Sequence, residues 1–383
     1  MTTIVYAPQK MSLTALPDDC LLACLARVPY ADLRNGLPCT CKSLRDAVAS
    51  PAFRKTREAA GYVEWAVFAS DARNTETAPY LIQASGAYHA APGPTLARVS
   101  YNYDHWNLAR LSSGRGDEVV LLQTDPTMRA DAYNPLQNSW RELAPPFRSS
   151  EWFGEGIGKW SNCGTNCATL GSTIMVIGGD VEPSMAIDVY DASQDTWSRR
   201  PDFPLREPGE YFSKAVEVDG KLWLYALEMG GSGPAYEEVN IQETFVYDPA
   251  TQTWTAGPRL PHELWLGPGG GAHWHCMAFE LRKRFCVMAC FQLAPEDARY
   301  LASIWDPIRG AWDEAPFPVP PVIALRGDSI DNNLIVHGVV DPTGPGGNSP
   351  RLFVLRPDSS DWDEWRIPDE LDRATQIAAV RLG

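Results

Sequence analysis

The sequence VYDASQDTW, residues 189–197, recurs as VYDPATQTW at 246–254 and as IWDPIRGAW at 304–312. Each copy has an apolar residue, an aromatic residue, Asp, and then Trp seven positions after the aromatic residue. The alternating residues predict a strand, the Asp suits the start of a type I turn, and the Trp begins a returning strand with its ring on the buried face. The motif therefore predicts a β-hairpin that is repeated along the chain.

Weaker copies extend the repeat in both directions. AYNPLQNSW at 132–140 and VLRPDSSDW at 354–362 keep the spacing, and a degenerate copy at 81–88 is followed by Pro92. The positions that correspond to the Trp are residues 88, 140, 197, 254, 312 and 362, which lie 50 to 58 residues apart. Seven units would require one more such position, and the sequence shows none.

Each repeat also has a second pair of short apolar runs before the hairpin. Examples are SKAVEVDGKLWLYALE at 213–228 and HCMAFELRKRFCVMACF at 275–291. Four strands in a unit of roughly 50 residues are typical of a β-propeller blade. With the diglycines at 178–179 and 230–231, the units resemble kelch repeats over residues 62–383. The resemblance implies a mainly β fold, a six-bladed kelch-type β-propeller.

The first unit is one strand short. It offers EWAVFAS at 64–70, YLIQAS at 80–85 and a strand from Tyr88, whereas TQIAAVRLG at 375–383 remains unassigned after the last hairpin. A propeller must close its ring, so we expect residues 375–383 to join the first blade and complete it.

The N-terminal part of the chain is different in kind. We expect residues 1–11 to be disordered and residues 12–57 to form a small helical domain. In that domain Leu21, Leu22, Leu25 and Val28 recur at helical spacing, after acidic residues that favour a helix N-terminus. A second helix is expected near Ala31 and a third from Cys41 to Val48, ended by Ser50-Pro51.

The order LPDDCLLACLARVP, then CTCKSLRDAVASPAF, resembles an F-box. The resemblance implies that these helices dock on the Skp-family adaptor of an SCF-type cullin-RING ubiquitin ligase, while the following domain holds a protein client as the substrate-recognition subunit. A helical cap that only packs on the propeller is the alternative. The residues implied in adaptor binding are Leu16, Pro17, Leu21, Leu22, Leu25, Val28, Pro29, Leu33, Cys41, Lys42 and Leu44.

Aromatic residues are frequent where we expect connections between blades. These connections and the loops between second and third strands open on one end of a propeller, and Trp and Tyr often supply hot spots of protein recognition. Some of the rings could instead pack between blades. The candidate client-binding residues are Tyr101, Tyr103, Trp106, Trp152, Phe153, Trp160, Arg206, Tyr211, Phe212, Trp265 and Trp274.

Composition argues against several other partners. The net charge is −15, and no basic cluster is longer than LRKR at 281–284, so we expect no nucleic acid. No apolar stretch approaches the ~20 residues of a membrane span, and no secretory leader is visible. We therefore expect no membrane partner and a cytoplasmic or nuclear location. We also expect nine reduced cysteines, with Cys20, Cys24, Cys39 and Cys41 acting as small hydrophobic residues.

No set of residues predicts catalysis. His273 and His275 lie beside Cys276 but lack further metal ligands, Cys163 and Cys167 suit ordinary thiols, and GPGGG at 267–271 lacks the ending of a phosphate loop. We expect no catalytic residue, metal or cofactor. The alternative function is a propeller enzyme or small-ligand-binding protein with a helical cap and no ubiquitin role.

Overall fold

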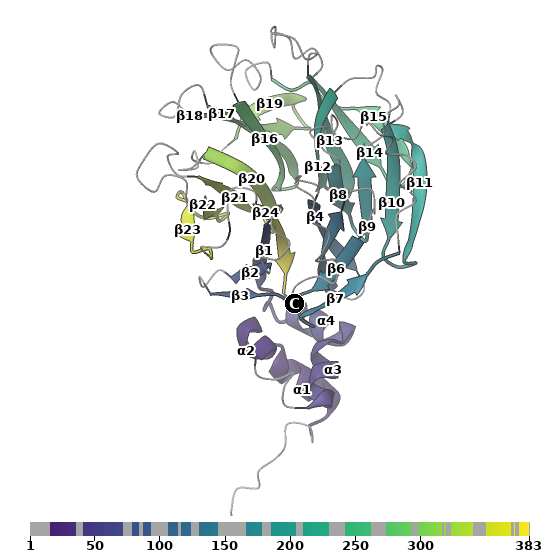
Figure 1. Ribbon diagram of the computed structural model, residues 1–383, viewed down its shortest axis with the longest axis vertical. Helices are drawn as coiled ribbons and strands as arrows, with labels where there is room; N and C mark the ends of the chain where they lie inside the picture. Colours follow the sequence, from purple (N-terminus) through teal and green to yellow (C-terminus); the bar gives the residue numbers. More distant parts are fainter. Residues whose placement is uncertain are drawn as a thin grey trace, which may run out of the picture.

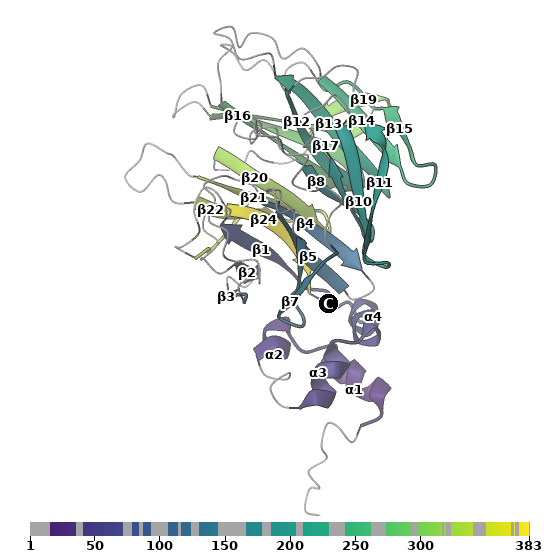
Figure 2. The same cartoon turned by 45° about the vertical axis from the view of Figure 1, so that its right-hand side comes forward.

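The structure of the protein is a computed structural model, which describes part of the chain. The described residues are 16–35, 41–71, 79–83, 87–92, 106–113, 116–123, 130–144, 166–177, 185–203, 210–229, 242–261, 273–292, 298–315, 318, 323–339, 350–368, 371 and 375–382. They form a β-propeller with a helical domain at one end (Figures 1 and 2).

The propeller consists of six four-stranded antiparallel sheets. From the inside outward, blade 1 is β24 (Thr375–Arg381), β1 (Trp65–Asp71), β2 (Tyr80–Gln83) and β3 (Tyr88–Ala90). Blade 2 is β4 (Trp106–Ser113), β5 (Gly116–Gln123), β6 (Ala130–Asn134) and β7 (Ser139–Glu142). Blade 3 is β8 (Asn166–Leu170), β9 (Thr173–Ile177), β10 (Met185–Asp191) and β11 (Thr196–Phe203).

The other three blades repeat this plan. Blade 4 is β12 (Glu210–Val218), β13 (Lys221–Met229), β14 (Gln242–Asp248) and β15 (Thr253–Ala256). Blade 5 is β16 (His273–Leu281), β17 (Arg284–Gln292), β18 (Ala298–Asp306) and β19 (Ala311–Glu314). Blade 6 is β20 (Ile323–Ile330), β21 (Asn333–Val339), β22 (Pro350–Leu355) and β23 (Asp363–Trp365). The innermost strands of neighbouring blades lie side by side around the ring.

The predicted repeat is confirmed, because each of the six blades ends in the hairpin that the motif marks. In blades 2 to 5 the residue two positions before the Trp has a positive φ: Asn138, Asp195, Gln252 and Gly310. The Tyr of the motif reaches this position, since Tyr190 Oη donates to Asp195 Oδ1 at 2.7 Å and Tyr133 Oη to Asn138 Oδ1 at 2.8 Å. The spacing is therefore set by a turn that requires one left-handed residue.

The expected ring closure is also confirmed. β24 pairs with β1 in antiparallel register from Trp65↔Arg381 to Asp71↔Thr375. It therefore forms the innermost strand of blade 1, next to β20 of blade 6 and β4 of blade 2. The two diglycines of the resemblance lie outside the described residues.

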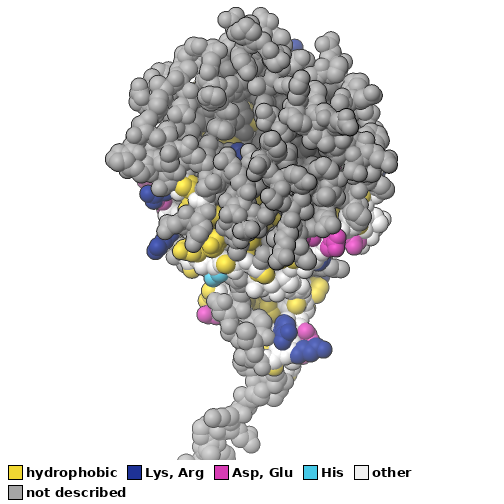
Figure 3. Space-filling model, viewed as in Figure 1, with side chains coloured by type: hydrophobic (Ala, Val, Ile, Leu, Met, Phe, Trp, Pro, Cys, Tyr) yellow, Lys and Arg dark blue, Asp and Glu magenta, His cyan; other side chains and the backbone are white. Residues whose placement is uncertain are grey.

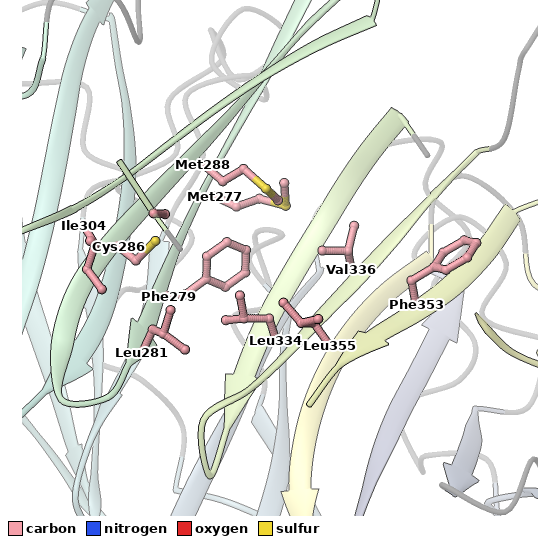
Figure 4. Close-up of a cluster of buried hydrophobic side chains, with 11 residues drawn as sticks. Met277, Phe279, Leu281, Cys286, Met288, Ile304, Leu334, Val336, Phe353 and Leu355 are labelled. Carbon is pink, nitrogen blue, oxygen red and sulfur yellow. The ribbon is translucent and has the colours of Figure 1, made fainter. Parts of the chain in front are cut away.

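The apolar core lies in the seams between blades. In the seam of blades 5 and 6, Phe279 from β16 points toward Leu334 and Val336 from β21, and Met277 and Met288 lie beside them (Figure 4). Similar clusters join blades 3 and 4, and blades 6 and 1. Each blade is thus stabilised mainly by its neighbours, which is why closing the ring matters.

The helical domain contains α1 (Asp18–Leu25), α2 (Tyr30–Asn35), α3 (Lys42–Val48) and α4 (Pro51–Ala59). The sequence pattern predicts Ser50-Pro51 only as a helix end, but the same pair begins α4: Ser50 Oγ accepts a hydrogen bond from the Phe53 N–H at 3.1 Å, and Pro51 occupies the first turn. None of the described helices is long and apolar enough to cross a membrane.

The prediction for Cys20 and Cys24 is wrong. Both thiols are exposed on α1, whereas Leu21 and Leu25 of the same helix are buried. The apolar neighbours in the sequence belong to another face of the helix, so helical periodicity rather than local composition decides which side chains enter the core.

Candidate functional site

The helical domain has its own small core. Leu21, Leu25, Leu33 and Leu44 are buried in it together with Phe53 and Val48. Four of the eleven residues that the sequence implies in adaptor binding are therefore used to hold the four described helices together. A partner that docks on the intact domain cannot reach their side chains.

The remaining candidates lie at the surface of this core. Leu16, Leu22, Val28 and Cys41 are half-buried against it. Pro17, Pro29 and Lys42 are exposed. These seven residues, which we call the helical contact set, remain available to a partner.

The helical domain also differs from the propeller in charge. Residues 12–59, which end with α4, contain seven Lys and Arg against four Asp and one Glu, which gives +2 while the whole chain carries −15. Exposed basic residues there are Arg27, Lys42, Arg45 and Lys55, and Figure 3 shows basic side chains on this part of the surface. This charge favours a partner with an acidic surface.

Tyr30 seats the helical domain on the propeller. Its side chain is fully buried, and its hydroxyl donates a hydrogen bond of 2.5 Å to the backbone carbonyl of Pro135 in the β6–β7 turn of blade 2. Its ring packs in one cluster with Val119, Val380 and Leu382. The domain is thus attached where blades 1 and 2 meet.

A second contact joins the last helix to the first strand. Arg57 of α4 is fully buried; its Nη2 lies 2.9 Å from Glu64 Oε1, and its Nη1 donates to the Val28 carbonyl at 2.7 Å. Glu64 Oε1 also accepts from the backbone N–H of Tyr30 at 3.1 Å. The sequence patterns do not point to Tyr30, Arg57 or Glu64, because no motif or repeat relates α2, α4 and the residue before β1.

The topology separates the two ends of the propeller. The β6–β7 turn, the end of β24 and the start of β1 all lie at the end that carries the helical domain (Figures 1 and 2). In a ring of up-and-down blades, the connections between blades and the loops between second and third strands must lie at the opposite end. The sequence places the candidate client-binding residues in those connections.

Four of these candidates are not in loops, so that part of the prediction is wrong. Trp106 begins β4, Tyr211 and Phe212 lie in β12, and Trp274 lies in β16. All four stand within the first three residues of an innermost strand, at the end of the propeller away from the helices. Tyr101, Tyr103, Trp152, Phe153, Trp160, Arg206 and Trp265 lie outside the described residues.

Two histidines and three cysteines are the residues whose side chains could take part in metal binding or thiol chemistry. His273, His275 and Cys276 lie in β16, and Cys163 and residues 267–271 lie outside the described residues. Burial raises the pKa of the Cys167 thiol to about 12, which disfavours the reactive thiolate. In the described part of the chain, no three His, Cys, Asp or Glu side chains are grouped so that they could hold a metal ion.

Comparisons with known proteins agree with this architecture. Residues 13–56 match the F-box domain family. The chain is 26% identical to F-box protein AFR of Arabidopsis thaliana over 258 residues, which cover 66% of this chain and 51% of that protein. It is 25% identical to Kelch repeat and BTB domain-containing protein 8 of Danio rerio over 100 residues, which cover 26% of this chain and 16% of that protein.

The matched region thus spans only about half of the first relative and less of the second. The N-terminal helices form an F-box domain, and a six-bladed β-propeller follows it. The kelch resemblance is consistent with the second relative.

Proposed function

We propose that this chain is the substrate-recognition subunit of an SCF-type cullin-RING ubiquitin ligase. The observation that carries the proposal is the F-box match over residues 13–56 in a domain seated on one end of a propeller. In this role the chain performs no chemistry itself. It holds a client near a ubiquitin-charged enzyme, and transfer is accelerated because the reacting groups are brought close together.

The adaptor binds the helical contact set. Leu16, Leu22 and Val28 supply apolar area that the small domain leaves half-buried, and Lys42 adds a positive charge at the start of α3. A Skp-family adaptor with an acidic rim around an apolar groove is the partner that this combination fits.

The client binds the opposite end of the propeller. Connections that carry several Trp and Tyr residues are suited to protein recognition, because these side chains bury large areas at low entropic cost and keep a polar group for orientation. A client held there is separated from the adaptor by the depth of the propeller. The proposal places the chain in the cytoplasm or nucleus.

Co-purification of the full chain with a Skp-family adaptor tests the proposal. We expect a stable complex whose formation is lost when Leu22 is replaced by Asp. A full chain that captures no adaptor, under conditions in which an established F-box protein does, would contradict the proposal. Elemental analysis of the same preparation addresses the alternative, since stoichiometric copper, iron or zinc would favour a propeller enzyme.

A further inference from the structure

Glu64 contacts three separate parts of the chain. Its Oε1 accepts hydrogen bonds from the Tyr30 N–H of α2 and from Arg57 Nη2 of α4. Its backbone carbonyl accepts a hydrogen bond of 2.8 Å from the N–H of Leu382, directly after the closing strand β24. The residue before β1 therefore connects the helical domain to the last described residue of the chain.

The packing of the Tyr30 ring depends on the same C-terminal segment. Ala378, Val380 and Leu382 lie with Tyr30 in one buried cluster, and Val380 and Leu382 are fully buried. Without them, the Tyr30 ring would lose a large part of the apolar surface against which it packs.

Arg57 extends this dependence to α4. A guanidinium that is fully excluded from solvent must be paired, because a buried charge without its partner is strongly destabilising. Its partners are the Val28 carbonyl and Glu64 Oε1, and the position of Glu64 is held by its backbone bond to Leu382. Displacing the C-terminal segment therefore releases Glu64, then Arg57, and with it α4.

We propose that Glu64 couples the position of the helical domain on the propeller to the closure of the propeller ring. The helices are joined to the propeller by contacts with β24 and Leu382, which lie far from them in the sequence. The helical domain is held in one orientation only when β24 and Leu382 are in place. Since such a coupling is reciprocal, loss of the helical contacts also loosens the C-terminal segment.

The functional consequence rests on the proposed function. If the helices bind an adaptor and the opposite end of the propeller binds a client, Glu64 is a positioning residue. It fixes the orientation of the client-binding end relative to the adaptor. A chain in which β24 and Leu382 are displaced could still bind an adaptor, but its client would have no fixed position relative to that adaptor. Complete propellers would then be favoured for ubiquitin transfer.

Hydrogen exchange on the protein alone tests the coupling without any adaptor. The first variant is a chain that ends at Arg381, which removes Leu382 but leaves every β1–β24 pair intact. We expect exchange in α2 and α4 to accelerate by at least about tenfold, while β12 and β13 of blade 4 keep their protection.

The reverse variant is Glu64→Ala, which should accelerate exchange in β24 as well as in α4. Glu64→Gln should restore only part of the protection, because its amide oxygen can still accept from Tyr30 and Arg57 but carries no charge to compensate the guanidinium. The matched control is Leu260→Ala, which removes a buried side chain near blades 4 and 5 without touching the Glu64 contacts.

Two results would overturn the proposal. One is unchanged exchange in α2 and α4 when the chain ends at Arg381, with acceleration confined to the C-terminal segment. The other is equal acceleration in Leu260→Ala, which would mean that the helices report only global stability. Adaptor capture, measured separately on the same variants, distinguishes failure of the coupling from failure of the proposed function.

Discussion

The indole Nε1 of Trp197 donates a hydrogen bond of 2.6 Å to the backbone carbonyl of Ala144, which follows the last strand of the preceding blade. The motif Trp of other blades does the same: Trp140 donates to Pro92, Trp312 to Arg259 and Trp362 to Pro318. The repeated Trp therefore connects one blade to the previous one. This explains why the repeat keeps a Trp at this position and a Pro-containing segment shortly after it.

The first prediction concerns this bond. Trp197 is almost fully buried, so Trp197→Phe loses a buried hydrogen bond of about 0.5–1.5 kcal/mol and leaves a small cavity. We expect urea unfolding to show a loss of about 1–3 kcal/mol. Trp312→Phe, at a half-buried site with the same type of bond, should lose less. Equal losses would show that burial of the bond is not what matters.

The second prediction concerns the seam of blades 5 and 6. A Cβ added at Gly327 of β20 would lie 2.6 Å from one Phe279 ring atom and 2.8 Å from Met277 Sδ. Gly327→Ala should therefore destabilise the propeller by about 1–3 kcal/mol, because the buried ring cannot move without disturbing the cluster in Figure 4.

A second substitution isolates this cause. Phe279→Leu alone should also destabilise, but in combination with Gly327→Ala the losses should be less than additive, because the smaller side chain leaves room for the new methyl group. Strict additivity in urea unfolding of the four chains would indicate that the cost of Gly327→Ala arises from the backbone instead.

The third prediction concerns pH. His337 of β21 is buried beside Arg326 of β20 and Leu352 of β22. Burial, together with the positive charge of Arg326, lowers the pKa of His337 to about 4. The unfolded chain, with a histidine pKa near 6.5, binds more protons between pH 6.5 and pH 4, so stability should fall as the pH falls through this window.

Replacing His337 by Leu should remove this contribution. Between pH 7 and pH 4.5 the wild-type chain should lose roughly 2–3 kcal/mol more than His337→Leu. The comparison of the two pH slopes is its own control, since the carboxylates titrate in both chains. If the free energy of unfolding, measured with urea, changed equally with pH in the two chains, the result would contradict a neutral buried imidazole at His337.

Sequence patterns predicted the parts of this fold that depend on local periodicity. The hairpin spacing, the number of blades and the strand that closes the ring follow from alternation and from one constant Trp. The contacts of Tyr30, Arg57 and Glu64 could not be predicted, because they join segments that no repeat relates. The same limit applies to the helical domain, where Leu22 and Leu25 have the same residue type but only Leu25 is fully buried.

The fourth prediction uses this difference between Leu22 and Leu25. Leu22→Asp places a charge at the half-buried edge of α1 and should lower adaptor affinity by at least about tenfold while the helices keep their circular dichroism. Leu25→Asp buries an unpaired charge and should unfold the helical domain itself. If both variants lost adaptor capture and both also lost helicity, Leu22 would be needed to fold the helical domain.

The last prediction concerns the ring closure. β24 contributes seven residue pairs to β1, and Ile377, Ala378, Ala379 and Val380 are buried. The other edge of β24 contacts the neighbouring blades. Toward blade 6, the Ala379 N–H donates to Asp328 Oδ2 at 2.6 Å and Arg381 Nη2 lies 2.5 Å from Asp331 Oδ1. Toward blade 2, the Arg381 N–H donates to Asp117 Oδ2 at 3.2 Å. The strand thus fastens blades 6, 1 and 2 together.

A chain that ends at Asp372 loses all of these contacts. Each backbone hydrogen bond contributes roughly 0.5–1.5 kcal/mol and each large buried apolar side chain about 1.5–3 kcal/mol, so the sum rivals the ~5–15 kcal/mol that holds a domain together. We expect insoluble or markedly destabilised protein, whereas a chain that starts at Met11 should be unaffected. Arg381→Ala should cost only ~0–1 kcal/mol, because that ion pair is half-exposed. A soluble chain of residues 1–372 that unfolds cooperatively at an unchanged melting temperature would show that the ring closes without β24.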